Sequence, residues 1–182
     1  SVSVISSNAA EVEAKGVEVE FTGILTDNLS VNGSVTYVQS EYTDYSNAPC
    51  AFLTNCSVAG TSQDLTGKTL DHAPELSFNL GAEYRNSMDG ANGVEWFGRI
   101  DMIYNGEQNL YVLLPDAAEE DAYALFNTRL GLESEGEWTL TLWGKNIFDE
   151  DYRVVAESDG TGGLAEVPGL PRTYGVTADW YF

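Results

Sequence analysis

The chain has 182 residues and carries 29 Asp and Glu against 8 Lys and Arg, which gives a formal net charge of −21 at pH 7. This balance excludes a nucleic-acid-binding protein, because a phosphate backbone needs clustered Lys and Arg. The sequence also offers no transmembrane helix, because it contains no run of eighteen apolar residues.

Seven segments of the chain alternate apolar and polar residues, which is the period of a β-strand. In chain order they are Gly16–Leu25, Leu29–Glu41, Glu75–Tyr84, Val94–Asn105, Tyr123–Glu133, Trp138–Asn146 and Arg172–Phe182. Short connections alternate with long ones near 42–74, 106–122 and 147–171. The sequence therefore predicts an all-β fold, an antiparallel up-and-down meander with short turns on one side and long loops on the other, as in outer-membrane barrels.

The alternation places the charges of the strands on one face. The uncharged parity runs from Val17 in the first segment to Phe182 in the last. The charged residues have the other parity: Glu18, Glu20, Glu75, Glu83, Glu95, Arg99, Asp101, Arg129, Lys145 and Asp179. A Lys or Arg at the bilayer midplane of a membrane barrel costs about 2–4 kcal/mol, so this exclusion is expected of a face in contact with lipid.

Aromatic residues gather near both ends of the uncharged face. Near the short turns are Tyr84, Trp96, Trp138, Trp180 and Phe182, and near the long loops are Tyr37, Tyr104, Phe126 and Tyr174. Two aromatic belts around an aliphatic band are typical of a barrel that crosses a bilayer, so we predict that these residues face lipid. A soluble β-sandwich also hides one face of each strand and would bury the same aromatic residues as core.

Few residues of this chain suggest a disulfide, a catalytic site or a metal site. Cys50 and Cys56 lie close together in a polar stretch, and we expect a disulfide rather than a metal site, since His72 is the only histidine. With one histidine and no serine placed by a motif, we assign no catalytic residue. The acidic stretch NIFDED could hold calcium, but a solvated loop is the simpler interpretation, and we assign no metal or cofactor.

Two aromatic residues near the predicted outer loops are candidate ligand contacts. Tyr111 lies in the acidic loop NGEQNLYVLLPDAAEEDA, which could also fold over its neighbours or extend the flanking strands as a short hairpin. Trp143 interrupts the polar parity of its segment, as Phe97 and Ile103 do. It could contact a plug or a ligand path, or merely pack locally.

Several stretches together resemble the late barrel strands of TonB-dependent outer-membrane receptors. AKGVEVEF with LSVNGSVTYVQSEYTD resembles a strand pair, and LTGKTLDHAPELSFNLGAEY resembles the passage from a loop into the next strand. WTLTLWGKNIFDEDYR is similar to the penultimate-strand motif, and PGLPRTYGVTADWYF to the closing strand with its terminal aromatic. The resemblance extends from about Glu11 to Phe182.

This resemblance implies a transmembrane barrel of about 22 strands with an N-terminal plug domain. Residues 1–182 would be the C-terminal part of that barrel, in the outer membrane of a Gram-negative bacterium. We expect the chain to be a piece of a longer one, because an odd-stranded open sheet would leave unpaired edges in lipid. A signal peptide is also missing at its start.

The resemblance also implies the partners of the protein. They are outer-membrane lipid, a small nutrient such as a ferric siderophore, TonB acting through the missing plug domain, and the barrel-assembly machinery, which would read the closing aromatic strand. The leading hypothesis is a receptor fragment, not an enzyme, for TonB-energised uptake. The alternatives are a soluble secreted β-sandwich that binds carbohydrate or calcium, and an outer-membrane barrel hydrolase built around His72.

Overall fold

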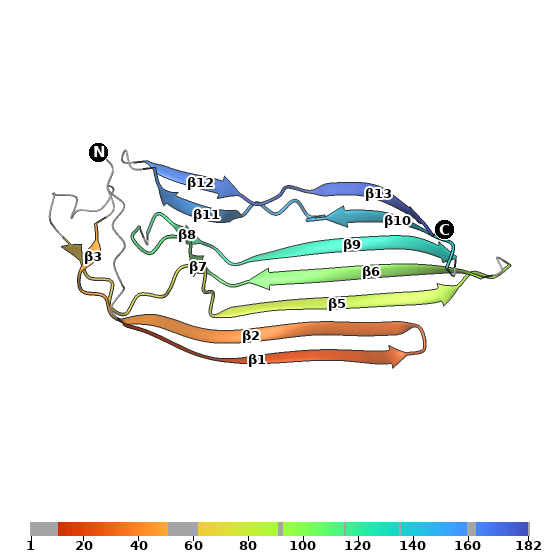
Figure 1. The fold of residues 1–182 in the computed structure, drawn as a ribbon, viewed down its shortest axis with the longest axis horizontal. Helices are drawn as coiled ribbons and strands as arrows, with labels where there is room; N and C mark the ends of the chain where they lie inside the picture. Colours follow the sequence, from red (N-terminus) through yellow and green to blue (C-terminus); the bar gives the residue numbers. More distant parts are fainter. Residues whose placement is uncertain are drawn as a thin grey trace.

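The computed structural model describes residues 11–50, 62–90, 93–114, 116–134, 136–159 and 163–181. Seven long strands pair in chain order into one antiparallel sheet (Figure 1). They are β1 (Glu11–Thr26), β2 (Leu29–Asp44), β5 (Leu76–Ser87), β6 (Val94–Asn105), β9 (Tyr123–Ser134), β10 (Trp138–Lys145) and β13 (Thr173–Trp180). The predicted seven-stranded meander is thus confirmed. Across the described ranges the sheet is open, with β1 and β13 at its edges.

The first two strands are longer than the sequence suggested. Pairing between β1 and β2 continues to Glu11 opposite Asp44, because residues 11–15 find partners along 39–44. On this extension Glu13 and Lys15 have the same parity as Val17, so the charge-free part of the face ends near Val17. The extension therefore has the composition of a water-exposed ribbon beyond the apolar band.

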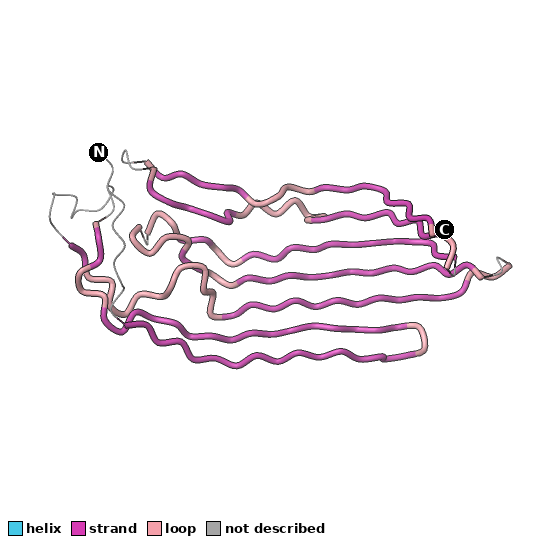
Figure 2. The backbone as a smooth tube through the Cα atoms, in the orientation of Figure 1, coloured by secondary structure: helices cyan, strands magenta, loops and turns pink. Residues whose placement is uncertain are grey.

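Three small two-stranded sheets lie within the long connections: β3 (Ala48–Pro49) with β4 (Ser62–Gln63), β7 (Gln108–Asn109) with β8 (Glu119–Glu120), and β11 (Arg153–Ser158) with β12 (Leu164–Pro168). Figure 2 shows these strands at one end of the long sheet, with the short turns at the other. The β7–β8 hairpin is the short hairpin that we gave as one alternative for residues 106–122. The β11–β12 hairpin was not predicted. Over the described ranges, no helix has the length and apolarity that crossing a membrane would require.

The strand register aligns the uncharged parities into continuous rows across the sheet. One such row contains Leu29, Tyr84, Gly98, Leu130, Leu142 and Val176. Its members remain open to solvent, since Leu130 is 57% exposed and Val176 is 62% exposed. The strong contacts of each long strand are with its hydrogen-bonded neighbours, so no second layer covers this face among the described residues. A soluble β-sandwich would have buried it.

The buried apolar core lies between the long connections rather than along the sheet. One cluster consists of Ala48, Leu65 and Val112, with Tyr42, Tyr45 and Leu113 packed against it. A second consists of Leu110, Ala118 and Ala156, with Tyr111 and Leu164. The loop 106–118 contributes to both clusters and thereby joins the two neighbouring connections.

Candidate functional site

The polar face of the sheet carries two ion-paired arginines in the half nearest the short turns. The Arg85 guanidinium lies 2.5 Å from Glu133, on β9, and over the ring of Phe97, with 5.0 Å from guanidinium carbon to ring centroid. Arg99 donates hydrogen bonds to both carboxylate oxygens of Asp101. These contacts join β5, β6 and β9 on the side opposite the apolar rows.

Phe97 owes its position to a glycine on the next strand. Gly131 is directly opposite Phe97 in the register, and a Cβ on Gly131 would overlap the Phe97 ring. The aromatic ring therefore lies flat across β9 and brings an apolar surface beneath Arg85.

Trp143 is held flat on the same polar face. It lies in β10, within the segment Trp138–Asn146 that the sequence predicted as a strand. Its indole Nε1–H donates to Thr177 Oγ1 at 3.1 Å, and a Cβ on Gly175 would come within 2.5 Å of the ring. Lys145 Nζ lies 5.8 Å from the ring centroid. Trp143 is therefore a fixed aromatic surface, whereas its role as a ligand contact stays a prediction.

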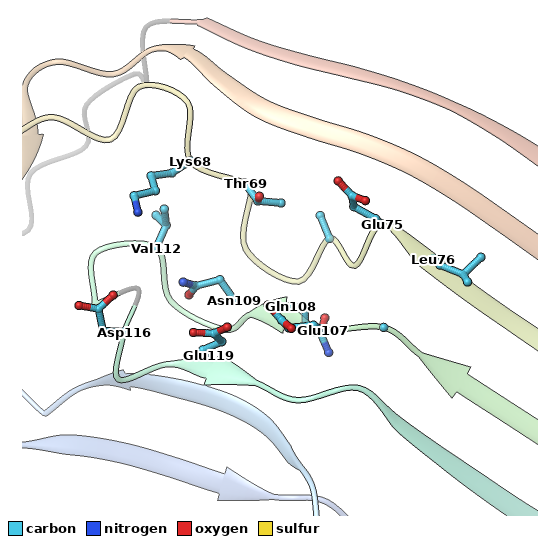
Figure 3. Close-up of a pocket in the computed structure, with 12 residues that line it drawn as sticks. Lys68, Thr69, Glu75, Leu76, Glu107, Gln108, Asn109, Val112, Asp116 and Glu119 are labelled. Carbon is cyan, nitrogen blue, oxygen red and sulfur yellow. The ribbon is translucent and has the colours of Figure 1, made fainter.

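A pocket of about 500 Å³ opens at the long-connection end of the sheet (Figure 3). Its walls are residues 68–76, which lead into β5, and residues 106–119, which include the β7–β8 hairpin. Carboxylates dominate its charged lining, with Glu75, Glu107, Asp116 and Glu119 against Lys68. A hydrogen bond that protonated Glu119 donates to the Glu107 carboxylate, together with the negative charge of Glu107, raises the pKa of Glu119. The pocket is thus an acidic cleft between two outer connections.

Tyr111 lies beside this pocket, in the contact between the two walls. The backbone N–H of His72 donates to the carbonyl of Asn109 at 2.8 Å, and the N–H of Val112 donates to the Asp71 carboxylate. Burial raises the pKa of Asp71, and this N–H donor opposes the shift. Burial also raises the pKa of Tyr111, with the Asp71 charge as a further cause. The structure places Tyr111 at a loop-to-loop contact, and ligand contact by Tyr111 stays a prediction.

Arg153 connects the β7–β8 hairpin to the β11–β12 hairpin. Its Nε donates to Glu120 Oε2 at 2.6 Å and its backbone N–H donates to Glu120 Oε1 at 2.9 Å. The guanidinium also donates to the carbonyl of Glu119 and pairs with Glu166 on β12. The side chain of Glu120 is only 9% exposed. A single arginine thus holds two outer hairpins together.

The aromatic residues of the predicted belts share one face wherever the strands are described. Tyr84 and Trp96 lie 5.3 Å apart between ring centroids, and Trp138 and Trp180 lie 6.5 Å apart, both near the short turns. Near the long connections Tyr104 stacks with Phe78, and Phe126 meets Phe148 edge to face. Tyr37 and Tyr174 are 45% and 82% exposed on the same face. Their contact with lipid stays a prediction, and Phe182 lies outside the described residues.

The other residues that the sequence singled out have simpler surroundings or cannot be placed. His72 has a left-handed backbone, with a φ of 55°, and serves the loop contact through its N–H. Among the residues that the structure describes, no group of three or more His, Cys, Asp or Glu side chains is arranged to hold a metal ion. The pairing of Cys50 with Cys56 stays a prediction, because Cys56 lies outside the described ranges.

Sequence reasoning missed three features of this region: the half-buried Asp71, the Arg153–Glu120 pair and the position of Arg129 opposite Trp143. The Arg153 and Glu120 side chains are 33 residues apart in the chain, so no local spacing signals their contact. The pairing of Arg129 with Trp143 follows from the register of β9 and β10, which the short SEGE turn could have suggested.

The comparisons with known proteins agree with this geometry. The family model described as TonB dependent receptor-like, beta-barrel matches residues 2–147. The ferric-pyoverdine M114 receptor PbuA of Pseudomonas sp. strain M114 is 26% identical over 177 residues, which are 96% of this chain and 19% of the relative.

Two solved structures share the fold at low identity. The ferric yersiniabactin uptake receptor FyuA of Yersinia pestis has a TM-score of 0.70 at 15% identity, covering 92% of this chain and 23% of that protein. The siderophore receptor PiuA of Acinetobacter baumannii has a TM-score of 0.68 at 16% identity, with coverage of 92% and 21%. The chain therefore spans about a fifth of the length of the relatives it matches.

Proposed function

The chain belongs to the TonB-dependent receptor-like β-barrel family, and from this premise we propose that it forms part of the wall of an outer-membrane receptor that takes up a ferric siderophore. In this proposal the seven long strands cross the outer membrane of a Gram-negative bacterium as part of a closed barrel. Residues 1–182 supply the C-terminal portion of the wall, and other parts of the receptor supply the plug domain and the contact with TonB.

The observation that carries the proposal is the exposed, charge-free face. Its rows run unbroken across all seven strands, and large apolar side chains such as Ile100, Leu130 and Val176 are 47%, 57% and 62% exposed. Apolar patches of this extent mark an interaction surface rather than an ordinary soluble surface. Such a face fits contact with the hydrocarbon of a bilayer, because the strands of a membrane barrel place apolar side chains outside and polar side chains inside.

The opposite face fits the interior wall of a barrel. It carries charges of both signs in satisfied pairs, such as Arg85 with Glu133 and Arg99 with Asp101. Charged networks of this kind are compatible with a water-filled or plugged lumen and incompatible with lipid. The acidic pocket and the three small hairpins then lie at the outer rim, where loops can meet a ligand.

The ligand class in this proposal comes from the relatives. PbuA is a receptor for ferric pyoverdine, and FyuA takes up ferric yersiniabactin. We therefore propose a ferric siderophore as the cargo, TonB as the energy-coupling partner, and the barrel-assembly machinery as the partner that recognises the closing aromatic strand. Outer-membrane lipid surrounds the wall.

The experiment uses the complete receptor that carries these residues, expressed in its own host. Deletion of its coding sequence is expected to abolish uptake of one ⁵⁵Fe-labelled siderophore from a panel, and re-expression is expected to restore it. The receptor should appear in the outer-membrane fraction and migrate faster on gels before heating than after, as closed barrels do. Recovery of the receptor in the soluble fraction, or unchanged uptake of every siderophore after deletion, would contradict the proposal.

A further inference from the structure

A groove of about 370 Å³ lies on the charge-free face of the sheet, away from the polar face and from the outer connections. Its apolar lining comes from two neighbouring rows of the strand register. One row contains Phe21, Leu80, Met102 and Phe126, and the next contains Val31, Ala82 and Ile100. The groove therefore crosses five strands, from β1 to β9.

Small residues create this hollow in the apolar face. Ala82 is directly opposite Val31 on one side and Ile100 on the other, so its methyl group lies between two larger side chains. In the next row Gly33 has no side chain, and a Cβ there would come within 2.8 Å of both Phe21 and Leu80. The Phe21 ring therefore lies over β2 and forms a wall at one end of the groove.

The aromatic residues of β6 give the depth of the groove in the proposed barrel. Ile100 is four residues from Trp96 and four residues from Tyr104, so it lies midway between the two predicted belts. In a barrel that crosses a bilayer this position is the middle of the apolar band. The surroundings at that depth are the acyl chains of lipids, and the headgroups lie outside it.

We propose that this apolar groove binds one acyl chain of a membrane lipid. An apolar protein cavity of about 150 Å³ holds one benzene molecule, so a space of about 370 Å³ has room for roughly fifteen carbon atoms. That is the size of a common fatty acyl chain. This inference rests on the proposed function, because lipid reaches this face only if the strands cross a bilayer.

Polar ligands and protein partners fit the groove less well than an acyl chain does. Asn32 also borders the groove, but its side chain has the opposite parity and accepts a hydrogen bond from Arg99 on the polar face. A polar ligand would therefore find no side-chain partner there. The groove is lined by nine residues, whereas a stable protein interface uses about 20–30 residues a side.

The test is photolabelling of the complete receptor in phospholipid nanodiscs that contain a trace of a phospholipid with a diazirine in the middle of one acyl chain. Mass spectrometry locates the adducts. Leu130 and Leu142, in the row next to Ile100, are the reference, because they are 57% and 56% exposed whereas Ile100 is 47% exposed. Contact with fluid lipid alone predicts more adduct at the two leucines. An acyl chain held in the groove predicts at least fivefold more adduct at Ile100 than at Leu130.

Two variants of matched chemistry test whether the groove itself holds the chain. Ala82→Phe places a ring in the groove and is expected to reduce the labelling of Ile100 at least fivefold. Ala178→Phe adds the same ring to the same face on β13, outside the groove, and is expected to leave the labelling unchanged. Heat-modifiable migration on gels shows that each variant is folded. If Ala82→Phe does not fold, the ratio of adducts at Ile100 and Leu130 in the parent still decides.

Three results would overturn the proposal. If Ile100 is labelled no more than Leu130, fluid lipid alone contacts this face. If folded Ala82→Phe keeps the labelling of the parent, the acyl chain lies outside the groove. If Ile100→Cys receptors form disulfide-linked pairs in oxidised membranes, a second copy of the receptor occupies the groove. Each of these results leaves the proposed function standing as long as siderophore uptake depends on the receptor, whereas a lack of adducts on every strand would contradict the bilayer location itself.

Discussion

The pair between Arg153 and Glu120 makes a quantitative test of how the outer hairpins are held. The perturbation is Glu120→Ala, which removes the acceptor of both the Arg153 Nε and the Arg153 backbone N–H. The glutamate side chain is 9% exposed and the arginine side chain 28%, so solvent replaces the lost bonds only in part. The hairpin β11–β12 is therefore expected to open more readily in this variant.

The magnitude follows from these contacts. A hydrogen bond to a charged group contributes about 1.5–3 kcal/mol, and an unpaired, partly buried donor costs about 1–3 kcal/mol. Because Arg153 keeps its contacts with Glu166 and with the carbonyl of Glu119, we take the lower part of these ranges and expect a loss of about 2 kcal/mol. A loss of about 2 kcal/mol corresponds to a roughly 30-fold increase in the open population.

The assay is hydrogen–deuterium exchange of the complete receptor, read by mass spectrometry on peptides from residues 153–168. Protection of these peptides should fall by roughly the same factor of 30, while peptides from β6 and β9 should not change. The matched control is Glu166→Ala, which removes a partner that is 43% exposed. Exposed pairs contribute about 0–1 kcal/mol, so its effect should stay below about fivefold.

The comparison of the two variants tests whether the burial of Glu120 sets the strength of its contact with Arg153. If Glu120→Ala and Glu166→Ala change protection equally, the buried position of Glu120 does not set the strength of the contact. If neither variant changes it, the apolar cluster of Leu110, Ala118 and Ala156 holds the hairpins without the arginine. Either result refutes the reasoning from burial and hydrogen-bond number.

Three other substitutions or conditions test the remaining features. Ile100→Lys, on the exposed apolar face, should cost about 2–4 kcal/mol near the bilayer midplane and reduce heat-modifiable barrel in the outer membrane, unlike the same change on the polar face. Gly131→Ala should cost about 1–3 kcal/mol in denaturant titrations because its Cβ overlaps Phe97, and Phe97→Leu in the same chain should restore part of this loss. Burial raises the pKa of Asp71 above its ordinary 3.8, so the loop packing that buries Asp71 should be most stable below pH 3.8 and lose stability as the pH rises through the raised value, even though the Val112 N–H favours the ionised carboxylate. Exchange of the Val112 amide measures this, and Asp71→Asn should remove the pH dependence.

The alternation of apolar and polar residues was enough to predict the long strands, because successive side chains of a strand point to opposite faces of the sheet, and one face is apolar and the other polar. The period of two in segments such as 94–105 survives whatever the neighbouring strands contain, and the structure has β6 over those same residues. Where a strand extends beyond the apolar band, apolar and polar residues no longer alternate, so alternation does not predict the strand there. The extension of β1 to Glu11 carries Glu13 and Lys15 on the apolar parity, so alternation alone ends the segment too early.

The hairpin β11–β12 escaped prediction for a related reason. Its strands are short and mostly exposed apart from the buried Ala156, and Val154 and Val155 are adjacent rather than alternating. The contacts that hold it, from Arg153 to Glu120 and from Ala156 to Leu110, join segments that are far apart in the chain. Contacts of this kind depend on the packing of two connections against each other, and no periodicity within one of them predicts such contacts.

The placement of the core agrees with the proposal that water and lipid stabilise different parts of this molecule. The outer connections bury Leu65, Leu110 and Val112 against one another, as a water-soluble domain does. The strands bury little and leave Leu130 57% exposed. Full burial of a large apolar side chain contributes about 1.5–3 kcal/mol. The partly exposed side chains of the sheet forgo a share of this in water, and in the proposed barrel hydrocarbon supplies it. Removal of detergent should therefore disrupt the strands, whereas substitutions in the outer clusters should disturb the loops and leave the wall intact.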